Sequence, residues 1–413
     1  MASKFNASFK KTIIALVYIA VGYAFFAYVY NNFFTQTTTF PRESVTYDLT
    51  HNTDYLQQKD TINILVVAGG GVRGLIPLHV LQYIEDKLGK PLDQVFDVFS
   101  GVSTGAIIAT GLNIPDEAIP SRNGQKLSHL DYLVDIYENE VNYLFSPPWY
   151  HKLLTAGGLF SPSYFGSRLH EVMEKHYTKD LNFTELENYV IIPSLNLKDG
   201  EIHLFKNKGE TVNYLPTDRL YQLMTAAVSA ETAFPPVVFN YSEDEGIQYC
   251  EPESAESENE SQCVFADAAI AMNNPASMIL RDVINEFPDK NYYILVLGAG
   301  SPRLLSSTTN YDTLKNWGQI NWFRDALTNM QRSMDTHQLH TLEIAKSLSE
   351  EGRIEYDYLN IEIREPFIGI FEHKKLPKLK NYSDQLIKDN QAQIDLIVDH
   401  LKSESIKNSS DKS

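Results

Sequence analysis

Two glycine-rich segments hold the residues of this chain that could do chemistry. The first reads Gly69-Gly70-Gly71-Val72-Arg73-Gly74, and the second reads Gly101-Val102-Ser103-Thr104-Gly105. In the second segment, the glycines two residues before and after Ser103 permit a sharp strand-to-helix turn that exposes the serine hydroxyl. In the first, consecutive backbone N–H groups at the start of a helix suit the stabilisation of an oxyanion. Together the two segments indicate an acyl-transfer enzyme with Ser103 as its nucleophile.

Each segment is expected to connect a buried strand to a helix. An apolar run at 62–67 precedes the first segment, and the run Val95-Phe96-Asp97-Val98-Phe99 precedes the second. Such runs ahead of a glycine turn predict buried strands, and the small and apolar residues after Gly105 predict a helix. Further strands are predicted at 191–197, 201–205 and 293–297, and strand-like and helix-like runs alternate without an obvious repeat, which is typical of one α/β domain.

A dinucleotide-binding loop is the main alternative for the first segment. Gly69, Gly71 and Gly74 also spell the G-x-G-x-x-G fingerprint of that site. Such a site needs an acidic residue about 20 residues further on, where this chain has Leu88-Gly89-Lys90-Pro91-Leu92. Arg73 inside the turn is also unusual for a dinucleotide loop. We therefore expect no nicotinamide or flavin cofactor.

The ordered motifs resemble the patatin-like phospholipase family, whose pattern is G-G-G-x-[RK]-G, then G-x-S-x-G, then a distant D-G-[GA]. The similarity runs from about Ile62 to Ser301 and includes an S-A-x-x-x-F-P-P-like segment at 229–236. The third motif is Asp267-Ala268-Ala269, followed by Asn273-Asn274-Pro275-Ala276. Ala268 stands where the family usually has glycine. If this position needs a positive φ, alanine would strain it by about 1 kcal/mol or more.

The resemblance implies a three-layer α/β/α fold with a mostly parallel central sheet and a catalytic dyad without histidine. Asp267 would take the proton of the Ser103 hydroxyl directly, because a partly desolvated carboxylate gains basicity. Gly70 and Gly71 would donate their N–H groups to the oxyanion, while Gly69 shapes the loop. Arg73 would have one of two roles, steadying this loop or offsetting charge on a phosphorylated substrate, and a purely structural ion pair is the alternative to both. We expect no cofactor, and no His/Cys cluster here has metal-ligand spacing, so we predict an enzyme without a metal.

A Ser-Asp-His triad is the other arrangement that a serine hydrolase could use. His337 and His340 follow Asp267 in the chain, but they fall in an amphipathic helical stretch where surface histidines are expected. The arginine-containing glycine loop also fits the dyad better. We therefore expect neither histidine to be needed for catalysis.

The N-terminal region predicts a membrane anchor. Residues 12–34 carry no charge and are almost continuously apolar, which is enough to span a bilayer. A cleaved signal peptide would have a shorter apolar core ending at small residues, whereas this one ends at bulky aromatics. Lys4, Lys10 and Lys11 precede the span, so the positive-inside rule places residues 1–11 in the cytoplasm and the catalytic domain on the other side of the membrane.

The two cysteines fit an oxidising location. Cys250 and Cys263 bracket an acidic stretch at 251–262 that has little apolar content to bury. We predict that residues 249–264 form a solvated loop insertion closed by a disulfide. Two unrelated reduced thiols remain the alternative.

Composition sets the remaining boundaries. The chain has 413 residues, of which 43% are hydrophobic, and a net charge of −18 argues against nucleic acid as a partner. We predict a polar tether at 35–60, a catalytic domain at 61–402 that closes with a helix near 386–401, and a disordered tail at 403–413. Pro147-Pro148-Trp149-Tyr150 could form a lipid-facing lid or a packed turn. The oligomeric state is not indicated.

These features predict a membrane-anchored serine lipid acyl hydrolase, with phospholipid as its expected substrate. A neutral-lipid lipase or a carboxylesterase is the nearest alternative. A membrane-tethered binding module that kept the fold without activity is an alternative of another class. Ser103 and Asp267 together argue against that module.

Overall fold

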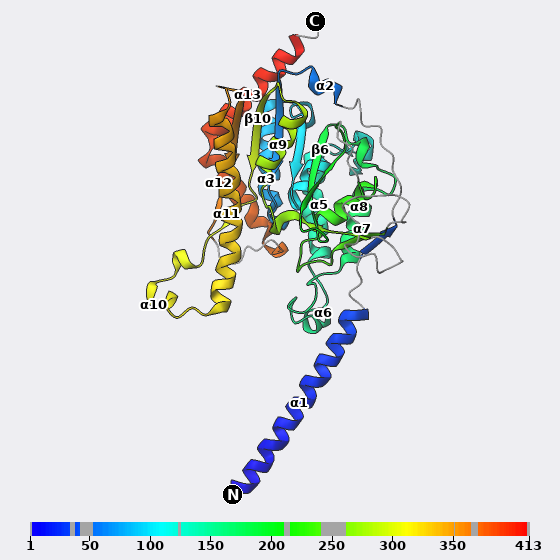
Figure 1. Ribbon diagram of the computed structural model, residues 1–413, viewed down its shortest axis with the longest axis vertical. Helices are drawn as coiled ribbons and strands as arrows, with labels where there is room; N and C mark the ends of the chain where they lie inside the picture. The colour runs from blue at the N-terminus through cyan, green and yellow to red at the C-terminus, as the bar shows by residue number, and fades with distance from the viewer. Residues whose placement is uncertain are drawn as a thin grey trace.

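A computed structural model describes residues 2–33, 38–41, 53–122, 125–209, 215–240, 262–350, 352–364 and 371–410. A central sheet lies between helices on both faces, and one long N-terminal helix projects away from this body (Figure 1). The three-layer α/β/α arrangement predicted from the sequence is therefore confirmed.

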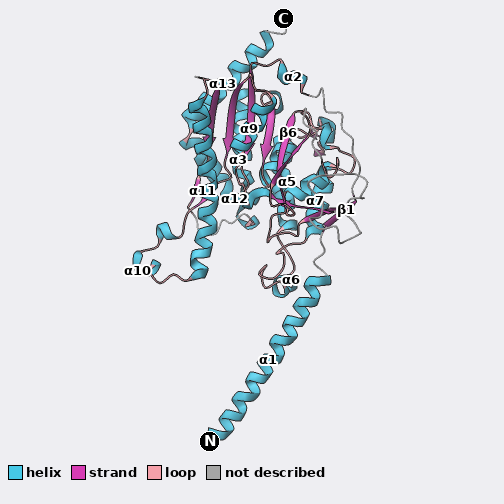
Figure 2. Cartoon of the chain, viewed as in Figure 1, coloured by secondary structure: helices cyan, strands magenta, loops and turns pink. Residues whose placement is uncertain are grey.

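The sheet contains nine strands in the order β1-β8-β9-β6-β3-β2-β10-β12, with β7 also paired to β6 (Figure 2). The central strands pair in parallel, whereas β9 runs antiparallel to both β6 and β8, and β7 runs antiparallel to β6. The sheet is thus mixed but mostly parallel. The strand bounds are β1 Thr38–Pro41, β2 Thr61–Val67, β3 Val98–Gly101, β6 Tyr189–Asn196, β7 Ile202–Lys206, β8 Val237–Asn240, β9 Gln262–Asp267, β10 Asn291–Leu297 and β12 Ile354–Leu359.

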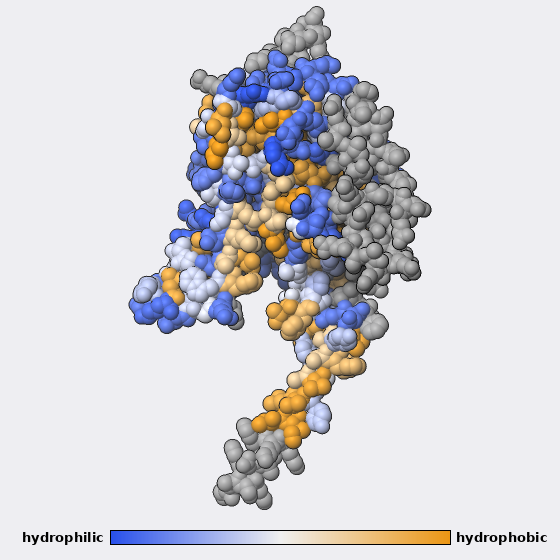
Figure 3. All heavy atoms as spheres, viewed as in Figure 1, coloured by the Kyte–Doolittle hydropathy of each residue, from blue (hydrophilic) through white to orange (hydrophobic). Residues whose placement is uncertain are grey.

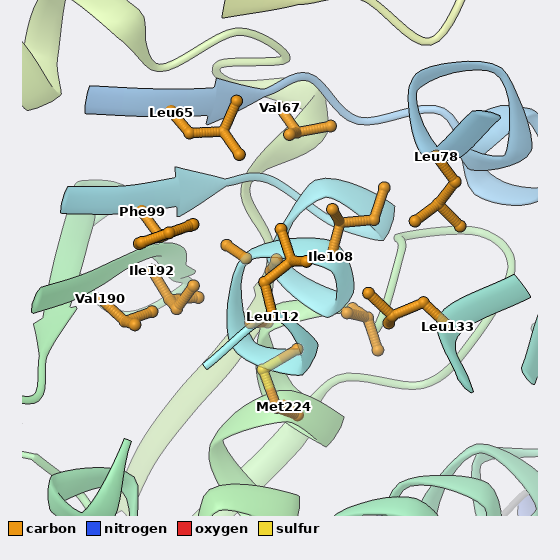
Figure 4. Close-up of a cluster of buried hydrophobic side chains, with 14 of the residues drawn as sticks. Leu65, Val67, Leu78, Phe99, Ile108, Leu112, Leu133, Val190, Ile192 and Met224 are labelled. Carbon is orange, nitrogen blue, oxygen red and sulfur yellow. The ribbon is translucent and has the colours of Figure 1, made fainter. Parts of the chain in front are cut away.

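Both faces of the sheet are buried, which explains why β2 is apolar along its whole length. Side chains alternate along a strand, so Leu65 and Val67 join one core cluster while Ile64 and Val66 join the other. Figure 4 shows Leu65 and Val67 beside Phe99, facing the helix that carries Ile108 and Leu112. The helices on this first face are α3 Leu75–Leu88, α4 Thr104–Gly111, α5 His129–Leu144, α7 Gly166–Tyr177, α8 Leu220–Ala227, α12 Leu376–Asp389 and α13 Gln391–Ser410.

The opposite face is covered by α9 (Ala276–Glu286), α11 (Gln319–Leu348) and the short α2 (Asp54–Gln57). Smaller elements connect these layers. They are α6 Trp149–Leu154, α10 Tyr311–Leu314, β4 Ser121–Arg122, β5 Gln125–Lys126, β11 Ser301–Pro302 and β13 Glu362–Ile363.

The N-terminal helix α1 spans Ala2–Phe33. Its segment Thr12–Asn32 is long and apolar enough to cross a membrane, a test that a signal sequence also passes. Apolar side chains cover this part of the helix where it leaves the body (Figure 3).

Two predicted boundaries were wrong. The region predicted as a tether at 35–60 contributes to the core, since Phe40 of β1 and Leu56 of α2 are buried. The tail predicted to be disordered from 403 continues as helix α13 to Ser410. In the first region, contacts with distant parts of the chain outweigh the polar composition. In the second, the regular helix continues despite it. The predicted strands at 191–197, 201–205 and 293–297 correspond to β6, β7 and β10.

Candidate active site

Ser103 occupies a strained turn between β3 and α4. Its φ is +57° and its ψ is −120°, in a region that residues other than glycine rarely adopt, at a cost of about 1–3 kcal/mol. The flanking glycines allow this turn to pack. A Cβ on Gly105 would lie 2.0 Å from the carbonyl oxygen of Val67, and one on Gly101 would lie 2.3 Å from the backbone of Gly105. The strand-turn-helix geometry predicted around Ser103 is therefore present.

The first glycine segment lies beside this turn and presents backbone N–H groups. Gly70 precedes the short 3-10 helix η1 (Gly71–Gly74), and Gly71 has a φ of +56°. The first N–H groups of a helix have no partner within it, and Gly70, Gly71 and Ser103 line one cleft. The N–H of Gly69 instead donates to the carbonyl of Asn273, over 3.0 Å. Gly70 and Gly71 thus line the cleft beside Ser103, whereas Gly69 ties the loop to the segment after Asp267.

Gly74 and Arg73 contact neighbouring parts of the protein and do not line the cleft. A Cβ on Gly74 would lie 2.3 Å from the Thr104 hydroxyl oxygen, so this glycine lets η1 pack on the helix after Ser103. Arg73 is 2% exposed, and its Nε donates to the carbonyl of Gly70 over 3.3 Å. Of the two roles predicted for Arg73, this contact supports steadying of the loop.

Asp335 of α11 is a partner of Arg73 that the sequence did not reveal. Burial lowers the pKa of Arg73 to about 10, and the negative charge of Asp335 opposes this shift. Burial also raises the pKa of Asp335 to about 6, against a hydrogen bond from Asn273 and the charge of Arg73. Asp335 of α11 therefore interacts both with Arg73 of the glycine loop and with Asn273.

Asp267 ends β9 and is fully buried. Its N–H donates to the carbonyl of Ser229 over 3.1 Å, and its Oδ1 accepts from the N–H of Ala269 over 2.9 Å. Oδ2 is buried without a hydrogen bond of normal geometry. Burial raises the pKa of Asp267 to about 7, while a hydrogen bond from the Ser103 hydroxyl acts in the opposite direction. The carboxyl group is therefore next to Ser103 and has the raised basicity that a general base requires.

The substitution of alanine for glycine at position 268 causes no strain. Ala268 begins the 3-10 helix η6 (Ala268–Ile270) and is not among the residues with positive φ. Asp267 caps this helix through its side chain. Because position 268 does not have a positive φ, the strain considered for alanine there does not arise.

The cleft that holds Ser103 and Asp267 extends between apolar side chains of α5 and α7. It encloses about 790 Å³, its open mouth included. The apolar lining residues include Ile136, Val141, Leu144, Leu169, Val172 and Met173. An apolar space next to a serine hydroxyl suits the acyl chain of a lipid ester.

His337 and His340 are exposed on α11, and neither lines this cleft. His340 lies instead in a separate shallow pocket with Glu343. In the described part of the chain, no histidine belongs to the cleft. That neither histidine is needed for catalysis stays a prediction.

The two cysteines are only partly described. Cys263 is buried on β9 and is disulfide-bonded. Cys250 and most of the predicted acidic loop at 249–264 lie outside the described residues, so the closure of that loop remains a prediction. Within the described ranges, no group of three His, Cys, Asp or Glu side chains could hold a metal ion.

The raised pKa of Asp267 predicts a pH dependence. As a base, Asp267 must be ionised, so we expect kcat/KM for a soluble ester to fall about tenfold per pH unit below about 7 and to level off above it. A pH series with the wild-type chain measures this. Asp335→Asn is the control, because its pKa near 6 could otherwise produce a similar profile. A rate that is flat between about pH 5 and 8 would contradict Asp267 as the base.

A serine on a strained strand-to-helix turn lies with a glycine loop and a buried carboxylate at one cleft of an α/β sheet, and these are the groups that a serine hydrolase needs. A family model described as patatin-like phospholipase matches residues 65–280, from within β2 to within α9. The chain therefore belongs to the patatin-like phospholipase family, as the motifs predicted.

Curated relatives agree with this assignment. Patatin-like protein 2 of Arabidopsis thaliana is 25% identical over 370 residues, covering 81% of this chain and 85% of the relative. Patatin group D-3 of Solanum tuberosum is 22% identical, covering 66% of this chain and 69% of that protein. Among solved structures, VipD from Legionella pneumophila covers 79% of this chain and 67% of its own, with a TM-score of 0.31 and 13% identity. That structural likeness carries no argument about function.

Proposed function

We propose that this protein is a membrane-anchored lipid acyl hydrolase that cleaves fatty-acyl esters of phospholipids. The observation that carries the proposal is the position of Ser103, on a strained turn between Asp267 and the Gly70-Gly71 loop, at an apolar cleft. Membership of a family that usually hydrolyses lipid esters supports the reaction class.

In the proposed reaction, Asp267 acts as a base toward Ser103. The Ser103 oxygen attacks the ester carbonyl carbon, and its proton passes to the Asp267 carboxylate. The N–H groups of Gly70 and Gly71 hold the resulting oxyanion. When the intermediate collapses, the departing alkoxide takes the proton back from Asp267, and the fatty-acyl group stays on Ser103. Water, deprotonated by Asp267, then attacks the acyl carbon; the ester bond to Ser103 breaks, the Ser103 oxygen takes the proton back from Asp267, and the fatty acid leaves.

The cleft supports a lipid substrate rather than a small ester. Burial of a long acyl chain among Leu144, Leu169 and Val172 removes apolar surface from water, at about 25 cal/mol per Å². A short ester would fill only the part next to Ser103. We therefore expect KM to fall as the acyl chain of the substrate becomes longer.

The test is fatty-acid release from phosphatidylcholine vesicles that carry the full chain. We expect hydrolysis by the wild type and none by Ser103→Ala. Triacylglycerol emulsions and a soluble butyrate ester separate the neutral-lipid and carboxylesterase alternatives. Vesicles that bind the protein while no ester is cleaved would support the binding module instead and overturn the proposal.

The proposed anchor is α1, with the catalytic domain on the non-cytoplasmic side. Lys4, Lys10 and Lys11 before the span support this orientation. We expect thiol reagents to label intact cells only after reduction, because the proposed Cys250–Cys263 bridge would form in an oxidising compartment. Protease added from outside the cytoplasm should reach the domain. Free thiols together with a protease-protected domain would contradict this topology while leaving the hydrolase proposal unaffected.

A further inference from the structure

A short segment next to α1 exposes an unusual number of apolar side chains. We call this segment, α6 with the loop that follows it, the α6 patch. Its exposed side chains are between 45% and 76% accessible: Trp149, Tyr150, Leu153, Leu159 and Phe160. Contiguous apolar exposure of this kind marks a surface that contacts protein or membrane.

The α6 patch is bound to the apolar part of α1. The Tyr23 hydroxyl donates to the carbonyl of Leu153 over 2.7 Å, and the Tyr30 hydroxyl lies 2.8 Å from Nδ1 of His151. Tyr23 and Tyr30 are seven residues apart, so they lie on one face of the helix about 10 Å apart along its axis. Two separate contacts therefore set α6 beside α1.

His151 connects these contacts to the catalytic body. Its side chain is fully buried, its Nε2 lies 3.2 Å from the carbonyl of Pro162, and its ring packs 4.3 Å from that of Phe165. Phe165 immediately precedes α7, whose side chains line the cleft. His151 thus connects α1 to the segment that leads into α7.

These contacts determine how deep α6 would lie if α1 spans a bilayer. The span Thr12–Asn32 has 21 residues, which gives about 32 Å of helix against about 30 Å of hydrocarbon. Tyr23 precedes Asn32 by nine residues, or about 14 Å. Leu153 is hydrogen-bonded to Tyr23. It therefore lies beside the membrane-spanning segment, within the hydrocarbon and not at the Asn32 end. A tyrosine hydroxyl in hydrocarbon needs a hydrogen-bond partner, and the Leu153 carbonyl supplies it.

A second exposed apolar region lies on the same side of the body. The tip formed by α10 and the first turns of α11 is on the side from which α1 projects (Figure 1). Tyr311, Trp322, Phe323 and Leu327 are exposed there. Phe323, Leu327 and Gln331 follow each other at intervals of four residues on one helix face, and Gln331 lines the cleft.

The cleft therefore has exposed apolar segments on two flanks. Phe145, at the end of α5, lines the cleft and leads directly into the α6 patch. On the other flank, the α11 face leads from Gln331 toward the α10–α11 tip. The net charge of −18 gives no attraction to anionic lipid, so apolar insertion into a zwitterionic surface is the mode that fits.

We propose that the α6 patch inserts beside α1 into the leaflet on the side of the catalytic domain. The α10–α11 tip touches the same surface, and the cleft between them receives its lipid from that leaflet without passage through water. This inference rests on the proposed anchoring by α1 and deepens the proposed function, because it names bilayer lipid as the source of the substrate.

The test uses the full chain carrying Ser103→Ala, Trp317→Phe and Trp322→Phe, which leaves Trp149 as the only tryptophan. In phosphatidylcholine vesicles brominated near the carbonyl end of the acyl chains, we expect strong quenching of Trp149 fluorescence compared with unbrominated vesicles. Acrylamide added to the water should quench poorly. Absence of bromine quenching would overturn the proposal: strong acrylamide quenching would then place Trp149 in water, and weak acrylamide quenching would place it against protein, such as a second copy of the chain.

Activity gives a second readout. Trp149→Ser combined with Phe160→Ser, in the otherwise wild-type chain, should lower hydrolysis of vesicle phosphatidylcholine by at least about tenfold and leave the soluble butyrate ester rate unchanged. Leu396→Ser is the matched control, because Leu396 is 70% exposed on α13, away from α1. Equal vesicle hydrolysis by the α6 variant and the wild type would contradict the proposal.

The proposed function can fail separately from the insertion of α6. Resistance of the chain to carbonate extraction reports whether α1 is anchored, and the soluble ester rate reports whether Ser103 is active. Bromine quenching depends on neither turnover nor substrate choice. An anchored but inactive chain with quenched Trp149 would retain the α6 contact and refute the hydrolase, whereas an anchored, active chain without quenching would refute the α6 contact alone.

Discussion

Ser103→Ala and Asp267→Asn are each expected to reduce ester hydrolysis by about 10³-fold or more. The serine variant lacks the oxygen that attacks the carbonyl. The asparagine variant keeps the size of the side chain but cannot accept the proton of Ser103, since a neutral amide is not a base. The measurement is kcat/KM for a soluble butyrate ester and for phosphatidylcholine vesicles, with both variants purified as the full chain.

Two controls separate loss of chemistry from loss of fold. His337→Ala and His340→Ala should keep near-normal rates, because both histidines are exposed on α11 outside the cleft. Asp267→Asn should be at least as stable as the wild type at pH 8. Burial raises the folded-state pKa of Asp267 from 3.8 to about 7, so ionisation across that window destabilises the folded chain, and asparagine avoids it. A histidine variant that folds but loses most activity would show that a triad operates.

Gly71→Val is expected to lower turnover by about 10²-fold or more. Gly71 has a φ of +56°, which valine adopts only with strain, and the residue lines the cleft together with Ser103. A displaced loop would lose at least one oxyanion donor. The measurement is kcat for the soluble ester, where binding of a long acyl chain does not contribute.

Gly89→Val serves as the matched control for this variant. Gly89 also has a positive φ, +68°, but a Cβ there meets no atom within 4 Å, and the residue lies at the end of α3 away from the cleft. The two substitutions impose similar backbone strain, so they should cost similar thermal stability. Turnover should fall only in Gly71→Val. Equal turnover in the two variants would mean that the glycine loop has a structural role alone.

The local parts of the site could be predicted from the sequence because each depends on neighbouring residues. The turn at Ser103 requires glycines at 101 and 105, where a side chain would collide with the backbone of β2 or with the turn itself. Asp267 is far from Ser103 in the chain, and only the resemblance to a family connected the two. The structure shows the reason, since β9 runs antiparallel beside β6 and ends next to the nucleophile turn.

Contacts between distant elements were not predictable in the same way. Asp335 resembles any polar residue of an amphipathic helix, and only the packing of α11 brings it to Arg73. Phe40 lies in a polar stretch, but β1 pairs in parallel with β8 and buries it. The Tyr23 and Tyr30 contacts with α6 likewise depend on the direction in which α1 leaves the body.

Identification of the nucleophile tests the proposed activity most directly. The full chain is treated with a fluorophosphonate, which phosphonylates an activated serine, and the modified peptide is identified by mass spectrometry. Stoichiometric modification of Ser103, absent after Ser103→Ala and strongly reduced after Asp267→Asn, is the expected result. An unmodified wild-type chain that is folded, or modification of another residue with Ser103 intact, would contradict a hydrolase that works through Ser103.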